Sequence, residues 1–284
     1  MIELLGKPVA ESLLSYVQSE IQKNNLHLCL VAVLVGDNAA SSVYIAKKKE
    51  AAERVGMEFR VMTFPTNITQ EQLESEITKL NNDDDITGYI IQLPLPPHLE
   101  MSKILQIVDP KKDVDGFHPL HTGALFGNAP QGSYLPPATS RAVMHILDFY
   151  KIPLSGKHAV VLGRGMVTGK PVALELLNRD CTVTICHSKT DNLKSYITQA
   201  DIVVSSLGKP HFLKQDMFKP GSVLVDVGFS RVNNSIRGDI DPTDIYHIAG
   251  ALAPVPGGVG PVTVSVLMEN TLTAYFLQHP HATQ

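Results

Sequence analysis

Cysteine is scarce in this chain, with 3 residues among 284, and no two of them form a CxxC pair. An odd number of scattered cysteines supplies no disulfide framework and suits a reducing compartment. Cys181 and Cys186 lie in a predicted strand with a spacing that sends them to opposite faces, which disfavours a shared metal site. We therefore expect Cys29, Cys181 and Cys186 to be small buried apolar residues.

Long apolar runs and a basic surface are also missing. No stretch of about 18 uninterrupted apolar residues is present, as a membrane-spanning helix would need, and residues 1–4 lack the pattern of a signal peptide. The formal net charge is -4, and the only short basic run is residues 47–49, which disfavours a nucleic-acid partner. These features predict a cytoplasmic protein that binds neither membrane nor nucleic acid.

What the sequence does contain is the composition of a globular enzyme, with 44% hydrophobic and 18% charged residues. A chain of 284 residues exceeds the usual size of one domain, so two domains are expected. In the N-terminal half, apolar strand patterns cover residues 27–35, 58–64 and 87–93, and helical patterns cover residues 9–24, 41–55 and 69–81. This alternation predicts an α/β domain with a mostly parallel sheet.

The C-terminal half repeats the alternation. Residues 108–140 are rich in Pro, Gly, His and Asp without periodicity, so we place the passage between domains there, followed by a helix over 140–150. Four buried strands are predicted at residues 157–163, 181–188, 201–208 and 222–229. We expect two α/β domains around a cleft, residues 1–138 and 139–261, the second Rossmann-like. The C-terminal helix, within 262–284, is expected to pack back on the first domain.

A glycine-containing loop follows the first strand of the second domain. Gly163, Arg164, Gly165 and Gly169 come between that strand and a helical run. Glycines let backbone N–H groups approach a pyrophosphate, and a helix N-terminus favours negative charge. Because Thr168 replaces the third glycine of G-x-G-x-x-G, the loop alone is also compatible with an ordinary strand-to-helix turn.

The end of the next strand bears on which dinucleotide would bind. An NAD site usually presents an acidic residue to the ribose there, but this strand ends in Cys186, His187, Ser188 and Lys189. With Arg164 nearby, these residues favour a cationic, hydroxyl-bearing pocket for a ribose phosphate. The predicted cofactor is NADP.

A tyrosine and a lysine in the first domain have the spacing for joint chemistry. In the predicted helix, the i, i+4 spacing places Tyr44 and Lys48 on one face. Lys48 accepts a proton only when neutral, so its pKa must fall below the reference value of about 10.4 through desolvation or nearby positive charge. Lys47 and Lys49 supply such charge, although a solvated basic helix face is compatible with this segment too.

Three further segments are distinctive: residues 88–96 (GYIIQLPLP), 112–117 (KDVDGF) and 254–261 (PVPGGVGP). Together with the Tyr44–Lys48 pair and the Gly-Arg-Gly loop, they closely resemble the bifunctional methylenetetrahydrofolate dehydrogenase/cyclohydrolase family over essentially the whole chain. The resemblance implies an NADP-dependent oxidation of methylenetetrahydrofolate and hydrolysis of the methenyl product to formyltetrahydrofolate. It also implies a homodimer.

The resemblance assigns roles to individual residues. Lys48 would be the key group of the cyclohydrolase step, Tyr44 and Gln92 would orient it, and Asp115 would anchor the pterin. The other substrate-binding residues that it implies are Ile91, Leu93, Pro256, Gly257, Gly258, Val259, Gly260 and Pro261. The cofactor-binding residues that it implies are Gly163, Arg164, Gly165, Ser188 and Phe229.

The chain departs from the family pattern in three places. Gly165 stands where the family commonly has Ser, residues 137–140 read Pro-Ala-Thr-Ser instead of Pro-Cys-Thr-Pro, and His121 stands where Asn is expected. Loss of the loop serine removes one hydroxyl donor to the cofactor phosphates. Asp115, His118 and His121 invite a metal interpretation, but we expect Pro119 to interrupt regular structure and no carboxylate or cysteine cluster accompanies them, so no metal is predicted.

Two other hypotheses remain at this stage. A shikimate-type dehydrogenase shares a plan of two domains with the dinucleotide fold second, but it would not need residues 112–116 and 257–261 together. A folate- or nucleotide-binding protein with degraded chemistry would explain the altered loops. Intact Tyr44, Lys48, Gln92 and Asp115 argue against that hypothesis.

Overall fold

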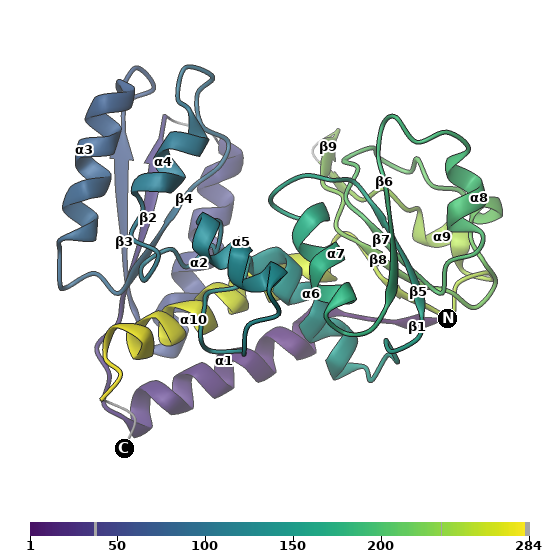
Figure 1. Cartoon of the computed structure of the whole chain (residues 1–284), viewed down its shortest axis with the longest axis horizontal. Helices are drawn as coiled ribbons and strands as arrows, with labels where there is room; N and C mark the ends of the chain where they lie inside the picture. Colours follow the sequence, from purple (N-terminus) through teal and green to yellow (C-terminus); the bar gives the residue numbers. More distant parts are fainter. Residues whose placement is uncertain (37–38, 234, 282–284) are drawn as a thin grey trace. The chain divides into compact units, whose positions relative to one another are not determined.

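The computed structural model describes residues 1–36, 39–233 and 235–281, with the side chains of residues 39–42 left out. The chain divides into two compact units (Figure 1). The first, called here the three-stranded unit, comprises Ser12–Ala138 and Val264–Gln284; the second, the six-stranded unit, comprises Met1–Glu11 and Thr139–Thr263. The domain limits 1–138 and 139–261 inferred from the sequence stay a prediction.

The three-stranded unit is built on a parallel sheet in the order β3-β2-β4. Its strands are β2 (Cys29–Val35), β3 (Glu58–Phe64) and β4 (Gly88–Ile91), connected by α2 (Ala39–Val55) and α3 (Gln70–Asn81). The remaining helices are α1 (Gly6–Lys23), α4 (Met101–Ile107), α5 (Pro119–Phe126) and α10 (Val259–Gln278), of which α1 and α10 start in the other unit. Every residue of β2 is buried, as the continuous apolar run of a central parallel strand requires.

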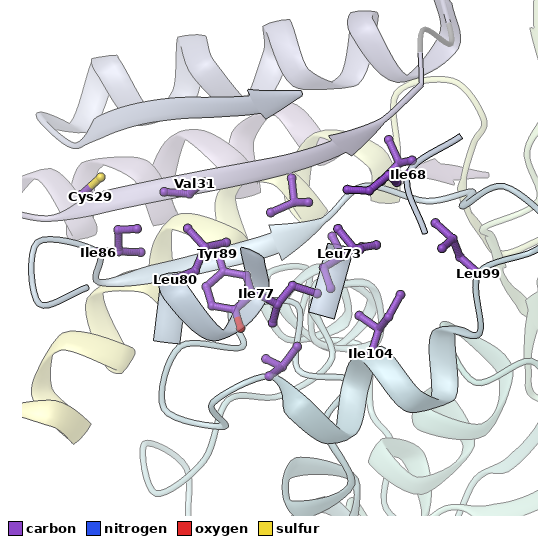
Figure 2. Packing of buried hydrophobic residues seen from close by; sticks show 14 residues of the cluster. Cys29, Val31, Ile68, Leu73, Ile77, Leu80, Ile86, Tyr89, Leu99 and Ile104 are labelled. Carbon is purple, nitrogen blue, oxygen red and sulfur yellow. The ribbon is translucent and has the colours of Figure 1, made fainter. Parts of the chain in front are cut away.

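The core of this unit lies between one face of the sheet and two helices (Figure 2). Alternate residues of β2, such as Cys29 and Val31, share the cluster with Leu73 and Ile77 of α3 and Ile104 of α4. The helix spacing of the α3 residues and the alternation along β2 explain why these side chains meet. This packing fixes β4, whose carboxyl end carries the candidate site.

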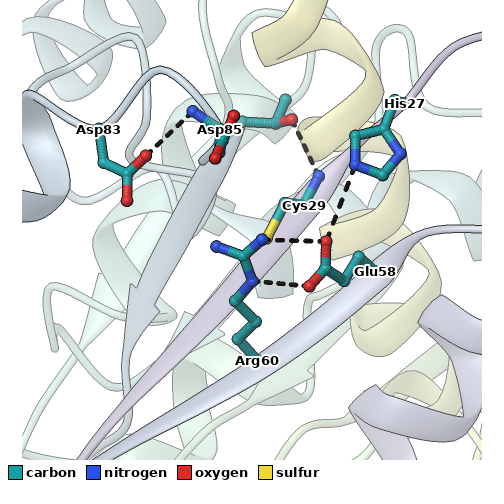
Figure 3. A network of polar contacts seen from close by, with 7 residues as sticks. His27, Cys29, Glu58, Arg60, Asp83 and Asp85 are labelled. Atoms are coloured by element: carbon teal, nitrogen blue, oxygen red, sulfur yellow. Dashed lines mark hydrogen bonds and ion pairs between the residues drawn. The ribbon is translucent and has the colours of Figure 1, made fainter.

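A polar network lies at the amino ends of the strands of the same sheet (Figure 3). Arg60 donates two hydrogen bonds to the Glu58 carboxylate, at 2.7 and 3.1 Å, and His27 Nε2 lies 3.7 Å from Glu58 Oε2. The Cys29 backbone N–H donates to Thr87 Oγ1 at 3.0 Å. Burial raises the pKa of the Cys29 thiol to about 11, so the thiol stays protonated. All three cysteines are buried and free, as predicted.

The six-stranded unit contains a parallel sheet in the order β1-β11-β8-β7-β5-β6. Its strands are β1 (Ile2–Glu3), β5 (His158–Leu162), β6 (Thr182–Cys186), β7 (Ile202–Ser205), β8 (Val223–Asp226) and β11 (Ala251–Ala253). Its helices are α6 (Ala138–Phe149), α7 (Gly169–Leu177), α8 (Leu193–Ile197), α9 (Pro242–Ile245) and the 3-10 turn η1 (Gln215–Met217), and β9 (Ser230–Val232) and β10 (Ser235–Arg237) form a hairpin. The prediction of an α/β chain with a mostly parallel sheet is confirmed.

Two sequence predictions about regular structure are wrong. The strand at 181–188 is not fully buried, because β6 is the edge of the sheet and Ile185 is 43% exposed. Pro119 does not interrupt regular structure but is the first residue of α5, and the His118 Nδ1 accepts the Leu120 N–H at 3.1 Å. Proline is well suited to the first turn, where its missing N–H would have no helical partner.

None of the helices in the described ranges is long and apolar enough to cross a membrane.

Candidate functional site

Lys48 and Gln92 meet at the carboxyl end of β4. Lys48 lies on α2, and its Nζ donates a hydrogen bond to Gln92 Oε1 at 3.0 Å. Gln92 follows the last residue of β4, and its backbone N–H continues the ladder by donating to Val33 O at 2.9 Å. Its amide Nε2 donates to Leu93 O at 2.9 Å, which points the amide oxygen toward the lysine. The structure thus brings together two residues that are 44 positions apart.

Lys48 and Asp115 influence each other's charge. Burial lowers the pKa of Lys48, and the nearby Asp115 carboxylate opposes that change. Burial raises the pKa of Asp115, and the Lys48 ammonium opposes it in turn. A lysine whose pKa is depressed by desolvation can exchange a proton nearer to neutral pH than an exposed lysine can.

The other predicted substrate residues in this unit have distinct environments. Tyr44 lies one helical turn before Lys48 and is half-buried, and burial raises the pKa of its phenol, so the hydroxyl stays neutral. Ile91 is 5% exposed and belongs to the core cluster. The carbonyl oxygen of Leu93 accepts the hydrogen bond from Gln92 Nε2. Their contacts with a substrate stay predictions.

The loop that carries Asp115 is anchored by residues that the sequence analysis did not identify. Lys112 is 5% exposed, and its Nζ donates to Leu80 O in the last turn of α3 at 3.1 Å and to Asp83 O just beyond that helix at 2.6 Å. Asn270 of α10 is 1% exposed and donates to Val114 O at 2.8 Å and Pro136 O at 2.9 Å. Nothing in the sequence of α10 singled out Asn270, because Thr, Ser and Glu residues also occur along that helix.

Gly116 shows how tightly this loop is packed. Its φ is +75°, and a Cβ there would lie 2.5 Å from Pro136 O and 2.6 Å from Leu135 O. His121 contributes to the same region, since its Nδ1 accepts the Leu135 N–H at 3.2 Å and its Nε2 lies 2.7 Å from Pro110 O. The His121 departure from the family pattern therefore has a structural role in this chain.

The glycine loop of the six-stranded unit connects β5 to α7. Gly163 has a φ of +115°, and a Cβ there would lie 2.5 Å from Ser206 Oγ and 3.0 Å from Ser206 O. A Cβ on Gly169 would lie 2.3 Å from Gly163 O, whereas a Cβ on Gly165 would meet nothing within 4 Å. The loop thus requires glycine at 163 and 169 for backbone packing, while Gly165 faces open space.

The remaining cofactor candidates follow the carboxyl ends of strands in the six-stranded sheet. Arg164 is exposed in the loop after β5, Ser188 is exposed in the turn after β6, and Phe229 is 44% exposed after β8. The order of the strands reverses at β5, since the next strand in the chain, β6, lies on one side of it and β7 lies on the other. Ligands of open α/β sheets bind at the carboxyl ends of strands beside such a switch point.

Two buried carboxylates, also not identified from the sequence, organise the loops after β7 and β8. Asp239 accepts hydrogen bonds from Ser205 Oγ at 2.6 Å and from the N–H groups of Leu207 and Lys209, each at 2.7 Å. Asp226 accepts the N–H groups of Gly228 and Ile240, each at 2.9 Å, and burial raises its pKa to about 7. These bonds fix the backbone of the loops that follow β7 and β8.

Residues 256–261 lie in the six-stranded unit, at the start of α10. Gly257 has a φ of +105° and accepts the Gly6 N–H at 2.7 Å. A Cβ on Gly6 would lie 1.8 Å from Gly258 O, so the two glycine segments pack backbone to backbone. The proposed wall of a folate pocket formed by Pro256, Gly257, Gly258, Val259, Gly260 and Pro261 stays a prediction.

Asp115, His118 and His121 do not gather as metal ligands. In the described ranges no group of three or more His, Cys, Asp or Glu side chains could hold a metal ion. The His118 Nδ1 instead caps α5.

Solved structures of moderate similarity share the fold. Shikimate 5-dehydrogenase from Thermus thermophilus, in complex with NADP(H) and shikimate, superposes with a TM-score of 0.54 at 16% identity, covering 86% of this chain and 99% of that one. At that identity the likeness concerns the fold alone.

Much closer relatives cover nearly the whole chain. The model of the tetrahydrofolate dehydrogenase/cyclohydrolase catalytic domain matches residues 4–115, and that of the NAD(P)-binding domain matches residues 137–279. The bifunctional protein FolD of Vesicomyosocius okutanii is 44% identical over 271 residues, 95% of this chain and 97% of that protein.

Two solved structures agree with this result. The bifunctional enzyme FolD of Campylobacter jejuni, a methylenetetrahydrofolate dehydrogenase/cyclohydrolase, superposes with a TM-score of 0.93 at 38% identity, covering 97% of this chain and 99% of that one. The Trypanosoma brucei methylenetetrahydrofolate dehydrogenase-cyclohydrolase, complexed with NADP cofactor and inhibitor, superposes with a TM-score of 0.90 at 34% identity, covering 96% and 95%. This chain therefore belongs to the tetrahydrofolate dehydrogenase/cyclohydrolase family.

Proposed function

We propose that the chain oxidises 5,10-methylenetetrahydrofolate to 5,10-methenyltetrahydrofolate with NADP and hydrolyses that product to 10-formyltetrahydrofolate, in one-carbon metabolism. The observation that carries the proposal is a partly buried Lys48 that is hydrogen-bonded to Gln92 and electrostatically coupled to Asp115. Relatives of the same length support it, since the Campylobacter jejuni protein is a bifunctional dehydrogenase/cyclohydrolase.

Asp115 is the group that we assign to the pterin. An ionised carboxylate accepts two hydrogen bonds, which matches the amino and imino donors on the edge of a pterin ring. The Lys48 ammonium favours the ionised form of Asp115 against the effect of burial. Tyr44 and Gln92 would position the one-carbon unit next to Lys48.

The residues of the 163–169 loop fit a dinucleotide. Gly163 and Gly169 leave no room for a Cβ, so the backbone of the loop itself forms the surface that a pyrophosphate would approach. We assign cofactor binding to Gly163, Arg164, Gly165, Ser188 and the backbone near Phe229. When bound, NADP supplies the acceptor for the hydride that leaves the methylene carbon.

The hydrolytic step is assigned to Lys48. The methenyl substrate is a cation, so its binding favours the neutral form of the neighbouring lysine, whose pKa burial already lowers. Water adds to the methenyl carbon as one of its protons passes to Lys48. The bond from that carbon to one ring nitrogen then breaks as Lys48 returns the proton to that nitrogen, and the hydroxyl proton is released to solvent as the formyl group forms. Gln92 Oε1 accepts a hydrogen bond from Lys48 Nζ and holds it in place.

A coupled assay tests this function. With methylenetetrahydrofolate and NADP, we expect cofactor reduction together with a methenyl absorbance that decays faster than it does without enzyme.

Replacing Arg164 with Ala should weaken the binding of NADP by roughly tenfold and the binding of NAD by much less, because the guanidinium is assigned to the ribose phosphate. Absence of cofactor reduction in the wild type would refute the function, and equal losses for both cofactors would refute the role of Arg164.

We also propose that the protein is a cytoplasmic homodimer whose product serves purine biosynthesis, and that it has no nucleic-acid partner. Three buried thiols suit a reducing compartment. Among the described residues, β6 is an edge strand of its sheet and exposes Ile185, so it presents a strand edge at which a second copy could pair. Sedimentation of the purified protein as a monomer would contradict the dimer.

A further inference from the structure

Asp113 is a buried acid that the proposed mechanism does not use. It is 4% exposed, and it lies two residues before Asp115 in the same loop. A parallel β-bridge between Asp113 and Tyr89 places Asp113 beside the edge of β4, the strand that leads to Gln92. Its position therefore connects the strand that supports Gln92 with the loop that carries Asp115.

Asp113 holds the backbone of the turn that follows Asp115. Its Oδ2 accepts the His118 N–H at 2.6 Å, and its backbone carbonyl accepts the Gly116 N–H at 3.1 Å. The carboxylate and the carbonyl of Asp113 therefore both hold the backbone of the turn. Bonds from residues 116 and 118 restrain the backbone immediately after Asp115, and Ala138 restrains Asp115 itself by donating its N–H to the Asp115 carbonyl at 3.2 Å.

Asp113 and Asp115 share a small cavity, so little water lies between the two carboxylates. Asp113 and Asp115 line a cavity of about 10 Å³ whose other lining residues are apolar or aromatic: Tyr89, Ile91, Met101, Leu105, Val108 and Phe117. This volume has room for about one water molecule. Burial raises the pKa of Asp113 to about 7, and the Asp115 charge adds to the rise while the hydrogen bond from the His118 N–H opposes it.

We infer that Asp113 is a positioning residue for the folate site, and that its ionised carboxylate fixes the 115–118 turn so that Asp115 faces Lys48 and the pterin. The inference rests on the proposed function. It predicts that loss of the Asp113 charge weakens folate binding in both reactions and leaves the cofactor site in the other unit unchanged.

The ionisation of Asp113 gives this role a pH dependence with a defined sign. Below about pH 7 the carboxyl is protonated, and it becomes a weaker acceptor for the His118 N–H. The titratable groups around it are Asp115, Tyr89 of β4 and, beyond Asp115, Lys48. We therefore expect kcat/KM for the folate substrate to fall as pH decreases through neutrality, with kcat/KM for NADP unaffected by this group.

The test compares Asp113→Asn, Asp113→Glu and the control Asp109→Asn. Asp109 belongs to the same segment, where its carboxylate accepts the Lys111 N–H at 2.9 Å. We expect Asp113→Asn to raise the KM for both folate substrates by about tenfold, to change the KM for NADP less than twofold, and to remove the limb near pH 7. Asp113→Glu should recover part of the folate affinity, and Asp109→Asn should behave as the wild type.

The results separate this inference from the proposed function. A wild type without either activity refutes the proposed function. An active wild type with an Asp113→Asn variant that is less stable to heat but has unchanged folate KM values assigns Asp113 a merely structural role and overturns the inference. If Asp113→Asn does not fold, the wild-type pH profile decides, since a folate kcat/KM that is flat from about pH 6 to 8 also overturns it.

Discussion

Replacing Lys48 with Met is expected to lower the rate of methenyltetrahydrofolate hydrolysis by about 10³-fold, the loss typical of removing a general acid–base group. Methionine keeps the length and the apolar stem of the side chain but cannot exchange a proton. The oxidation step needs no such group, so NADP reduction should continue and the methenyl product should accumulate. Stopped-flow absorbance of the methenyl chromophore measures both steps in one trace.

Lys47 provides the matched control for this experiment. It is the adjacent lysine on α2 and is exposed, so Lys47→Met removes the same charge from the same helix without entering the site. Hydrolysis within twofold of the wild type is expected for that variant. A Lys48→Met protein that is folded and retains full cyclohydrolase activity would defeat the assignment of Lys48.

Replacing Gly169 with Ala is expected to raise the KM for NADP by roughly tenfold to a hundredfold. The new Cβ would lie 2.3 Å from Gly163 O and 2.6 Å from Gly163 C, both backbone atoms, so the loop must move. Strain of about 1–3 kcal/mol at such a position corresponds to that range of affinity. Steady-state kinetics with varied NADP measures the effect.

The same variant contains its own internal control, because methenyl hydrolysis uses no cofactor and should remain at the wild-type rate. Gly165→Ala is the contrasting variant, since a Cβ there meets no protein atom within 4 Å and the loop backbone need not move, so its KM for NADP should rise less than that of Gly169→Ala. Equal effects at positions 165 and 169 would show that loop packing does not govern cofactor binding.

The sequence was sufficient for the architecture because periodicity is a local property. Continuous apolar runs such as Cys29–Val35 predict buried parallel strands, and the i, i+4 spacing predicts a shared face for Tyr44 and Lys48. The strands β1 and β11 escaped prediction because 2 and 3 residues are too few to show a period. Pro119 was misjudged because a proline looks the same whether it ends a helix or starts one.

The residues that support the site were harder to predict from the sequence. Although residues 112–117 form a distinctive motif, the burial of Lys112, Asp113 and Asp239 could not be predicted, because it depends on contacts with segments far along the chain. Gln92 was assigned through the resemblance, while its hydrogen bond with Lys48 depends on the pairing of β4 with β2. The motifs were therefore enough to predict the reactive side chains, but the hydrogen-bond network that orients them could be identified only from the folded structure.

A crystal structure of the protein with a non-reactive folate analogue tests the whole account in a single experiment. The pterin edge should donate hydrogen bonds to the carboxylate of Asp115, with the position of the one-carbon unit within reach of Lys48 Nζ. A pterin bound elsewhere, with that lysine facing only solvent, would contradict the proposed site and the chemistry built on it.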